Sequence, residues 1–147
     1  MSTELNEVSK HDFSFKLCKA GFYSVIGLVI PKVIGMTLDH FDPDWVNKFE
    51  QHSPGILNGW RFVNSYATAM ATGVYLAGGI RSKLYSVIDN DHISDLATLA
   101  ASTAIYASAE LGFSVLLESR FDPKDILYAA GASAVTLLVN KLVTRNQ

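Results

Sequence analysis

The chain is poor in cysteine, in charged residues and in positive charge, and each shortage excludes a class of protein. Cys18 is the single cysteine, so it cannot form an internal disulfide and does not suggest a metal site. The formal net charge is −2, which argues against nucleic acid as a partner because phosphate backbones bind basic surfaces. Charged residues make up 18% of the 147 residues and hydrophobic residues 49%. This composition favours one domain rich in apolar segments.

Motifs for catalysis and cofactor binding are also missing. No glycine-rich phosphate loop follows a strand-like segment. Ser119 adjoins Arg120, but no histidine is near it in sequence, so a nucleophilic role is not indicated. The histidines lie far apart in expected loops and lack the spacing of metal ligands; they are His11, His40, His52 and His92. We expect neither a metal nor a cofactor, and the sequence identifies no catalytic residue.

Long apolar stretches are what the chain does contain. Residues 62–80 hold no charge, and residues 97–117 hold only that of Glu110. About twenty apolar residues in a helix cross the hydrocarbon core of a bilayer. The sequence therefore predicts an all-α polytopic membrane protein, with four transmembrane helices in an up-down bundle after a polar segment at 1–19. The predicted spans cover about 20–38, 61–80, 96–117 and 125–143.

A soluble α-helical module is the alternative to this interpretation. The mean hydropathy of +0.20 is low for a protein with four spans. The cause is local, because the apolar stretches are built from Ala, Gly, Ser and Thr more than from Leu and Ile, and the segments between them are polar.

Lys and Arg are unevenly distributed between the predicted loops. Seven lie on the side of both termini and four on the opposite side, so the positive-inside rule places both termini in the cytoplasm. The outer loop at 39–59 carries Phe41, Trp45 and Phe49 at intervals of four. This spacing predicts a short helix at 44–51 on the membrane surface, acting as an interfacial anchor or as a lid over a ligand.

Small residues recur every four positions in the second and third spans. Close van der Waals contact holds helices together in lipid, and small residues let two backbones approach. We therefore expect the second and third spans to pack along these two seams. They are Ser65, Ala69, Gly73 and Ala77 in the second span, and Ala100, Ala104, Ser108 and Gly112 in the third.

Glu110 is the candidate functional residue, because an ionisable group inside a span is costly and usually faces a partner, a ligand or water. A charged turn follows it, and we expect Glu110, Arg120, Asp122 and Asp125 to converge at the outer ends of the third and fourth spans. These four are the binding candidates. Two alternatives remain: Glu110 pairs only structurally, with Arg120, Lys32 or an amide, and the two aspartates only cap the fourth helix.

The segment from residue 110 to residue 131 resembles the VanZ-like family of small bacterial membrane proteins. Glu110, Arg120, Phe121-Asp122 and Asp125 stand in the order typical of that family. Phe113 replaces the usual Gln, and Ala129 replaces the usual Asn. The resemblance implies a multi-pass protein of the bacterial cytoplasmic membrane, belonging to the cell envelope.

Three functions follow from these observations. The first is a VanZ-like envelope protein that binds a lipid-linked or amphiphilic molecule at the Glu/Arg/Asp cluster. The second is a non-catalytic membrane subunit, or a holin-like oligomer of phage type, assembled through the small-residue seams. The third is the soluble module. The expected partners are membrane lipid and, for the second function, other membrane subunits or further copies of the chain.

Overall fold

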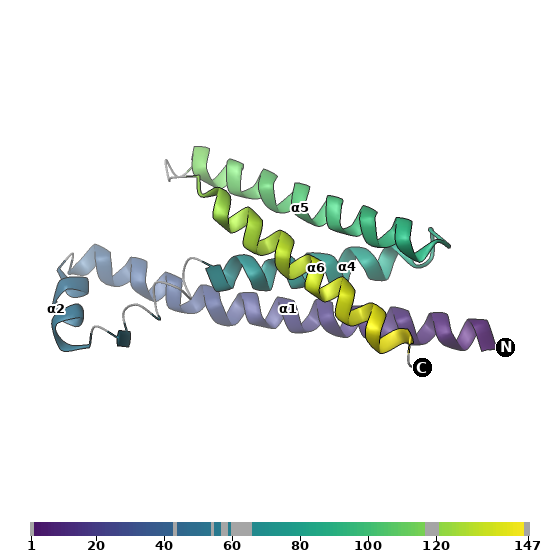
Figure 1. Cartoon of the computed structure of the whole chain (residues 1–147). Coiled ribbons are helices and arrows are strands. Elements are labelled where there is room, and N and C mark those ends of the chain that lie inside the picture. Colours follow the sequence, from purple (N-terminus) through teal and green to yellow (C-terminus); the bar gives the residue numbers. More distant parts are fainter. Residues whose placement is uncertain are drawn as a thin grey trace.

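The computed structural model shows helices joined by turns (Figure 1). No strand occurs among the residues that the structure describes, so the predicted all-helical class is confirmed for that part of the chain. The described residues are 2–42, 44–53, 55–56, 59, 66–116 and 121–145, without the side chains at 2–10, 32, 36, 39, 50 and 145.

One short helix and four long ones make up the described chain. The short helix lies within one residue of the range predicted for it, and in Figure 1 it folds back at the end of the first long helix. The two termini lie toward the same end of the molecule. The helices are α1 (Ser2–Phe41), α2 (Trp45–His52), α4 (Thr68–Leu84), α5 (Asp91–Leu116) and α6 (Pro123–Arg145).

Three of the described helices are long and apolar enough to cross a membrane. The qualifying segments are His11–Gly35 in α1, Asp91–Leu116 in α5 and Pro123–Thr144 in α6. The predicted span at 61–80 lies partly outside the described residues, and its described part belongs to α4, which has 17 residues. Length and composition thus support a membrane protein with at least three candidate spans.

Helix α4 lies at the centre of the bundle, in contact with α1, α5 and α6. Glycines set the close approach to α1. A Cβ atom added at Gly78 would lie 2.6 Å from the backbone nitrogen of Cys18, and one added at Gly21 would lie 2.5 Å from that of Tyr75. Gly78 lies against Cys18 and Tyr75 lies against Gly21. Because the residue numbers fall along α4 as they rise along α1, the two helices are antiparallel. Only residues without a side chain allow backbones this close.

Helix α6 packs on another face of α4. A Cβ atom at Gly73 would collide with the carbonyl oxygen of Ala129. The hydroxyl of Ser133 donates to the Gly73 carbonyl at 3.0 Å. Further along both helices, the Asn140 amide reaches the Tyr85 hydroxyl. Because the contacts advance in the same direction, α4 and α6 are parallel.

Small and polar side chains fill the interior, and large apolar ones cover much of the outside. Ser94 and Thr98 are fully buried, whereas Leu96 is 70% exposed on the same helix. Some buried hydroxyls bond within their own helix: Thr98 Oγ1 donates to the Ser94 carbonyl at 2.7 Å. This distribution is opposite to that of most soluble domains, in which large apolar residues are the most buried. It suits a chain whose surroundings are apolar.

The structure corrects the expected pairing of the two small-residue seams. In α4, Ala69, Gly73 and Ala77 are buried, but they belong to the helix that packs against α1 and α6 as well as α5; Ser65 lies outside the described residues. The α5 seam is not used within the described chain, since its residues are exposed and no atom lies within 4 Å of a Cβ at Gly112. The exposed α5 residues are Ala100, Ala104, Ser108 and Gly112.

Helix α5 instead buries a second stripe with the same spacing of four. Its members are Ser94, Thr98 and Ser102. Hydroxyl residues can be buried here because each is small and its hydroxyl has a partner. Thr98 and Ser102 donate to carbonyls of their own helix, and the Ser94 hydroxyl accepts from Arg81. Spacing alone could not distinguish the two stripes.

Candidate functional site

Glu110 is partly buried on α5, one turn after Tyr106. Tyr106 lies within electrostatic range of both Glu110 and Asp125, which sits in the first turn of α6. The two acidic residues therefore approach a common neighbour at the ends of α5 and α6. Arg120, the cationic member predicted for this cluster, lies outside the described residues.

Asp122 forms the start of α6. Its carboxylate accepts a hydrogen bond from the backbone nitrogen of Lys124 at 2.9 Å, and its carbonyl accepts one from the nitrogen of Asp125 at 3.1 Å. These contacts satisfy backbone N–H groups that the first turn of a helix leaves without partners. The side chain of Asp122 therefore caps α6, as one of the sequence alternatives anticipated.

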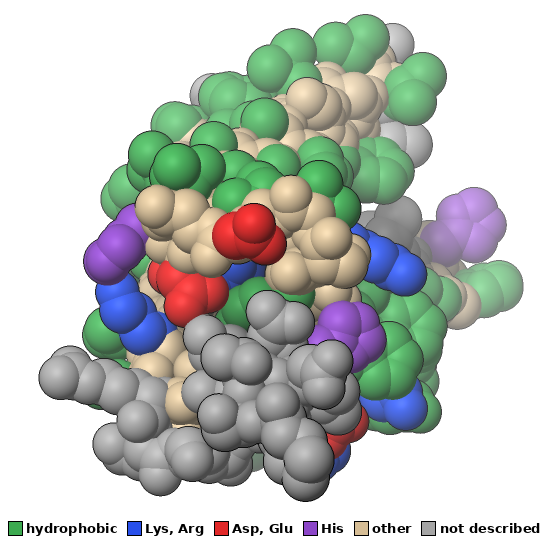
Figure 2. Space-filling model, turned by 90° about the vertical axis from the view of Figure 1, so that its right-hand side faces the viewer, with side chains coloured by type: hydrophobic (Ala, Val, Ile, Leu, Met, Phe, Trp, Pro, Cys, Tyr) green, Lys and Arg blue, Asp and Glu red, His purple; other side chains and the backbone are tan. Residues whose placement is uncertain are grey.

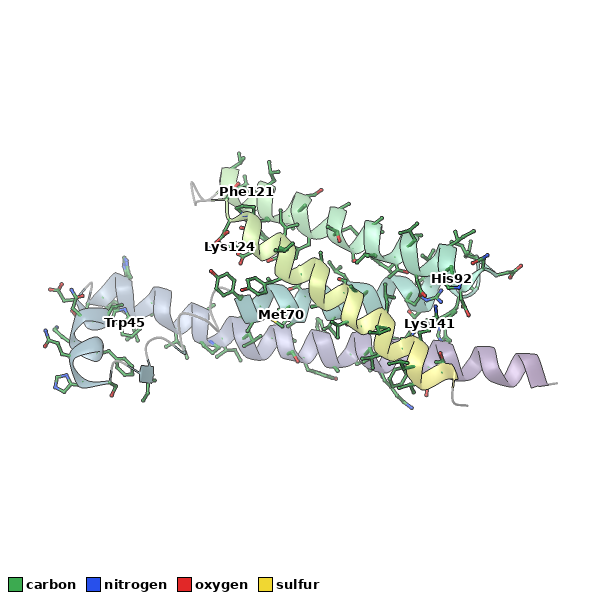
Figure 3. The ribbon with its side chains drawn as sticks, in the orientation of Figure 1. Trp45, Met70, His92, Phe121, Lys124 and Lys141 are labelled. Carbon is green, nitrogen blue, oxygen red and sulfur yellow. The ribbon has the colours of Figure 1, made fainter. Side chains whose placement is uncertain are left out.

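An apolar groove of about 660 Å³ lies between α1, α4 and α6. This volume falls within the range of small-molecule sites, roughly 300–1,000 Å³. Met70, labelled in Figure 3, lines it from α4. Small residues on all three helices create the space, because they hold the backbones close while leaving little side-chain volume. The lining comprises Ala20, Gly21 and Ser24 of α1, Met70, Ala71 and Val74 of α4, and Leu127, Tyr128, Gly131, Ala132, Val135 and Thr136 of α6.

The groove reaches the charged start of α6 at one end. Tyr128 lines it, and the ring of Tyr66 lies against the Tyr128 ring with 4.5 Å between centroids. Lys124 and Asp125 lie one helical turn before Tyr128. In Figure 3, Lys124 stands at that end of α6 and Lys141 at the opposite end. An apolar groove thus leads to a polar rim.

A second cluster, which the sequence did not reveal as a site, surrounds the side chain of Arg81. Arg81 is 3% exposed at the end of α4. Its guanidinium contacts the Ser94 hydroxyl, lies 3.0 Å from an Asp91 oxygen and lies 2.9 Å from an Asp95 oxygen. The Tyr85 ring covers it at 4.0 Å. Acidic and basic side chains gather at this end of the molecule, while hydrophobic ones cover its upper part (Figure 2).

Asn140 extends this cluster to α1. Its amide nitrogen donates to the Ser14 hydroxyl and to the Tyr85 hydroxyl, both at 2.9 Å. Its carbonyl oxygen is buried and has no hydrogen-bond partner among the described residues. It adjoins a cavity of about 20 Å³ that Arg81 and Asp95 also line. That volume suits a single water molecule.

Sequence reasoning treated Arg81 as one of the charges of a cytoplasmic loop. Two signals could have located the cluster. Asp91 and Asp95 are four residues apart and so share one helix face, directly after the turn that follows Arg81. Asn140 is a carboxamide inside an otherwise apolar stretch, where such a group is expected to have a partner.

The described residues contain no group of three His, Cys, Asp or Glu side chains arranged to hold a metal ion. No protein-family model matches the chain, and no curated protein and no solved structure is similar to it.

Proposed function

We propose that this chain is an integral membrane protein that binds a lipid-linked or amphiphilic molecule. The apolar part of the ligand occupies the groove between α1, α4 and α6, and its polar part lies at the charged start of α6. The observation that carries the proposal is the groove itself, which has about 660 Å³ of apolar space ending one turn from Lys124 and Asp125. In this proposal Glu110, Arg120, Asp122 and Asp125 form the polar rim.

The proposed topology has four spans in an up-down bundle, with 61–80 as the second. The antiparallel pairing of α1 with α4 and the parallel pairing of α4 with α6 support it. Helix α2 lies on the membrane surface in this arrangement. Its Trp45 and Phe49 rings are 6.2 Å apart on one side of the helix, as an interfacial anchor requires.

The resemblance of residues 110–131 to the VanZ-like family supports a place in the bacterial cell envelope. We infer a multi-pass protein of the cytoplasmic membrane with both termini in the cytoplasm. Binding without catalysis suits the residues described, since the groove lining contains only apolar, Gly, Ser, Thr and Tyr side chains.

Copurification tests the proposal. The protein would be purified in a mild detergent, and amphiphiles extracted from it would be identified by mass spectrometry. Gly131→Leu adds a side chain at the groove lining, and nothing lies within 4 Å of a Cβ placed there. Gly112→Leu is the matched control, an equally open helical glycine on α5. We expect the first variant to lose the copurified amphiphile and the second to retain it; equal retention would refute the groove as the binding site.

Self-association is the second candidate function, and the exposed α5 seam favours it. Ala104 and Gly112 lie on an exposed stripe of small residues, and nothing described lies within 4 Å of a Cβ placed at Gly112. Such stripes bring helices together in membranes. Light scattering of the protein in detergent would show an oligomer that Ala104→Leu dissociates. Extraction of membranes with carbonate addresses the soluble alternative, because release of the chain into the supernatant would exclude both membrane functions.

A further inference from the structure

The depth of the groove matches one leaflet of a bilayer. Its α6 wall runs from Leu127 to Thr136, a rise of about 14 Å at 1.5 Å per residue. A hydrocarbon core is about 30 Å thick, so one leaflet contributes about 15 Å. The groove therefore begins near the start of α6 and ends near the middle of that candidate span. An extended hydrocarbon chain fits a groove of this length and direction, whereas a compact ligand would fill only part of it.

The serine and threonine hydroxyl groups along the groove are already satisfied by their own helices. Ser24 Oγ donates to the Ala20 carbonyl at 2.9 Å. Thr136 Oγ1 donates to the Ala132 carbonyl at 2.8 Å. Neither requires a polar partner from a ligand, so the part of the ligand below the rim is apolar.

Lys124 supplies positive charge on the same face. It precedes Tyr128, Gly131 and Val135 by four, seven and eleven residues, a spacing that keeps all four on one side of α6. Its side chain is exposed, and no ion pair joins it to another of the described residues. The positive end of the α6 dipole adds to this charge.

The nearby described carboxylates have other neighbours. Asp122 accepts a hydrogen bond from the α6 backbone. Asp125 and Glu110 lie within electrostatic range of Tyr106 of α5. Among the described charged residues at the start of α6, Lys124 is the one that shares a side of the helix with Tyr128, Gly131 and Val135.

We infer that the groove holds one acyl chain of an anionic phospholipid, with the lipid phosphate at Lys124. This inference rests on the proposed function and names its ligand class. Lysine binds phosphate as a point charge at the end of a flexible stem, so the site selects the sign of the headgroup more than its shape. Selection between anionic and zwitterionic lipids is the property that separates this ligand from amphiphiles in general.

Native mass spectrometry of the purified protein, titrated with phosphatidylglycerol or with phosphatidylcholine, tests the inference. We expect phosphatidylglycerol to bind about fivefold more tightly, since one lysine near a charged lipid surface contributes about that factor. Lys124→Gln should abolish the preference by weakening phosphatidylglycerol binding more than phosphatidylcholine binding, and Lys124→Arg should keep it. Gly131→Leu should weaken binding of both lipids, and Gly112→Leu neither. Thermal melting of each variant verifies that it is folded.

The outcomes separate the inference from the proposed function. If Gly131→Leu removes binding but Lys124→Gln retains the preference, amphiphile binding stands and the phosphate contact is refuted. Equal binding of the two lipids by the parent protein would also overturn the inference, in favour of an uncharged or zwitterionic ligand. If Gly131→Leu binds both lipids as the parent protein does, the acyl chain of the lipid does not occupy the groove, and both proposals fail.

Discussion

The two ends of helix α6 are packed in different ways. Near Asn140, side chains from α1, α4 and α6 touch directly through hydrogen bonds at 2.9 Å, beside the buried Arg81 cluster. Near Tyr128, the same three helices leave an apolar groove of about 660 Å³. One end is held by directional polar contacts that allow a single arrangement, and the other by small residues that leave room. Ligand binding belongs at the second end, where packing within the chain is incomplete.

Replacing Arg81 should destabilise the Asn140 end of the bundle more than any other change considered. Arg81→Met would leave Asp95 partly buried without its cation. Breaking a buried ion pair costs about 3–5 kcal/mol. The side chains of Asp91 and Asp95 are 47% and 22% exposed, so we expect a smaller loss of unfolding free energy, about 2–3 kcal/mol. Denaturant unfolding in detergent measures it. Lys83→Met, at an exposed position in the same turn, is the control, and an equal loss there would refute a special role for Arg81.

A methyl group at the α1–α4 crossing should have the next largest effect. In Gly78→Ala the new Cβ would meet backbone atoms of Cys18 at 2.6 Å and of Ser14 at 2.9 Å. Backbone cannot rotate away as a side chain can, so we expect a loss of about 1–3 kcal/mol. Gly112→Ala should instead gain up to about 1 kcal/mol, because alanine favours helix and nothing obstructs it. Thermal melts of the two variants should therefore shift in opposite directions, and a shared direction would contradict the close approach.

Asn140→Leu should cost less than either change. It removes the two hydrogen bonds from the amide, each contributing about 1 kcal/mol. It also removes the buried carbonyl oxygen, which has no partner among the described residues, and this offsets part of the loss. We expect a net loss of about 1 kcal/mol, measured by the same unfolding experiment. Amphiphile binding should not change, because Asn140 does not line the groove. If binding falls with stability, the two ends are coupled.

The smallest effect is expected from the ion pair in the turn between α1 and α2, which belongs to neither end of α6. The Lys48 ammonium binds the Asp42 carboxylate at 2.7 Å and lowers the pKa of Asp42 below its ordinary value of 3.8. Because the pKa of Asp42 is lower in the folded state than in the unfolded state, its ion pair stabilises the fold at pH values above the unfolded-state pKa. That stability is lost as the pH falls through the folded-state pKa. Amide exchange in α2 should therefore accelerate below about pH 4. Lys48→Gln should abolish that dependence; if the variant keeps it, another group is responsible.

Hydropathy predicted the long helices well, because lipid-facing composition is a property of each segment alone. The predicted span at 125–143 lies inside α6, and the predicted span at 96–117 lies inside α5 except for residue 117, which is outside the described residues. The first span was predicted at about 20–38. Helix α1 begins earlier, at Ser2, and its segment that is long and apolar enough to cross a membrane is His11–Gly35. The charged residues in this first part of α1 lower its mean hydropathy, so a prediction from hydropathy alone does not include it in a span.

The contacts between helices could not be predicted in the same way. Gly112 and Thr98 both lie on stripes with a spacing of four, yet only Thr98 is buried. Which stripe is used depends on the partner helix and its register, and those are properties of the whole bundle. Arg81 illustrates the same limit. As a residue in sequence it belongs to a loop, and only the fold brings Asp91, Asp95 and Ser94 around it.

The length of α1 has a practical consequence for imaging. Its 40 residues span about 60 Å, more than the roughly 40–45 Å of a bilayer with its headgroups, and Figure 1 shows both of its ends extending past the other long helices. A chain of 16.1 kDa offers too little mass for particle alignment by electron microscopy. A rigid helical fiducial fused in register to the first turns of α1 would be coupled through one continuous helix to Gly21, which lines the groove. Density for an occupant could then be sought directly.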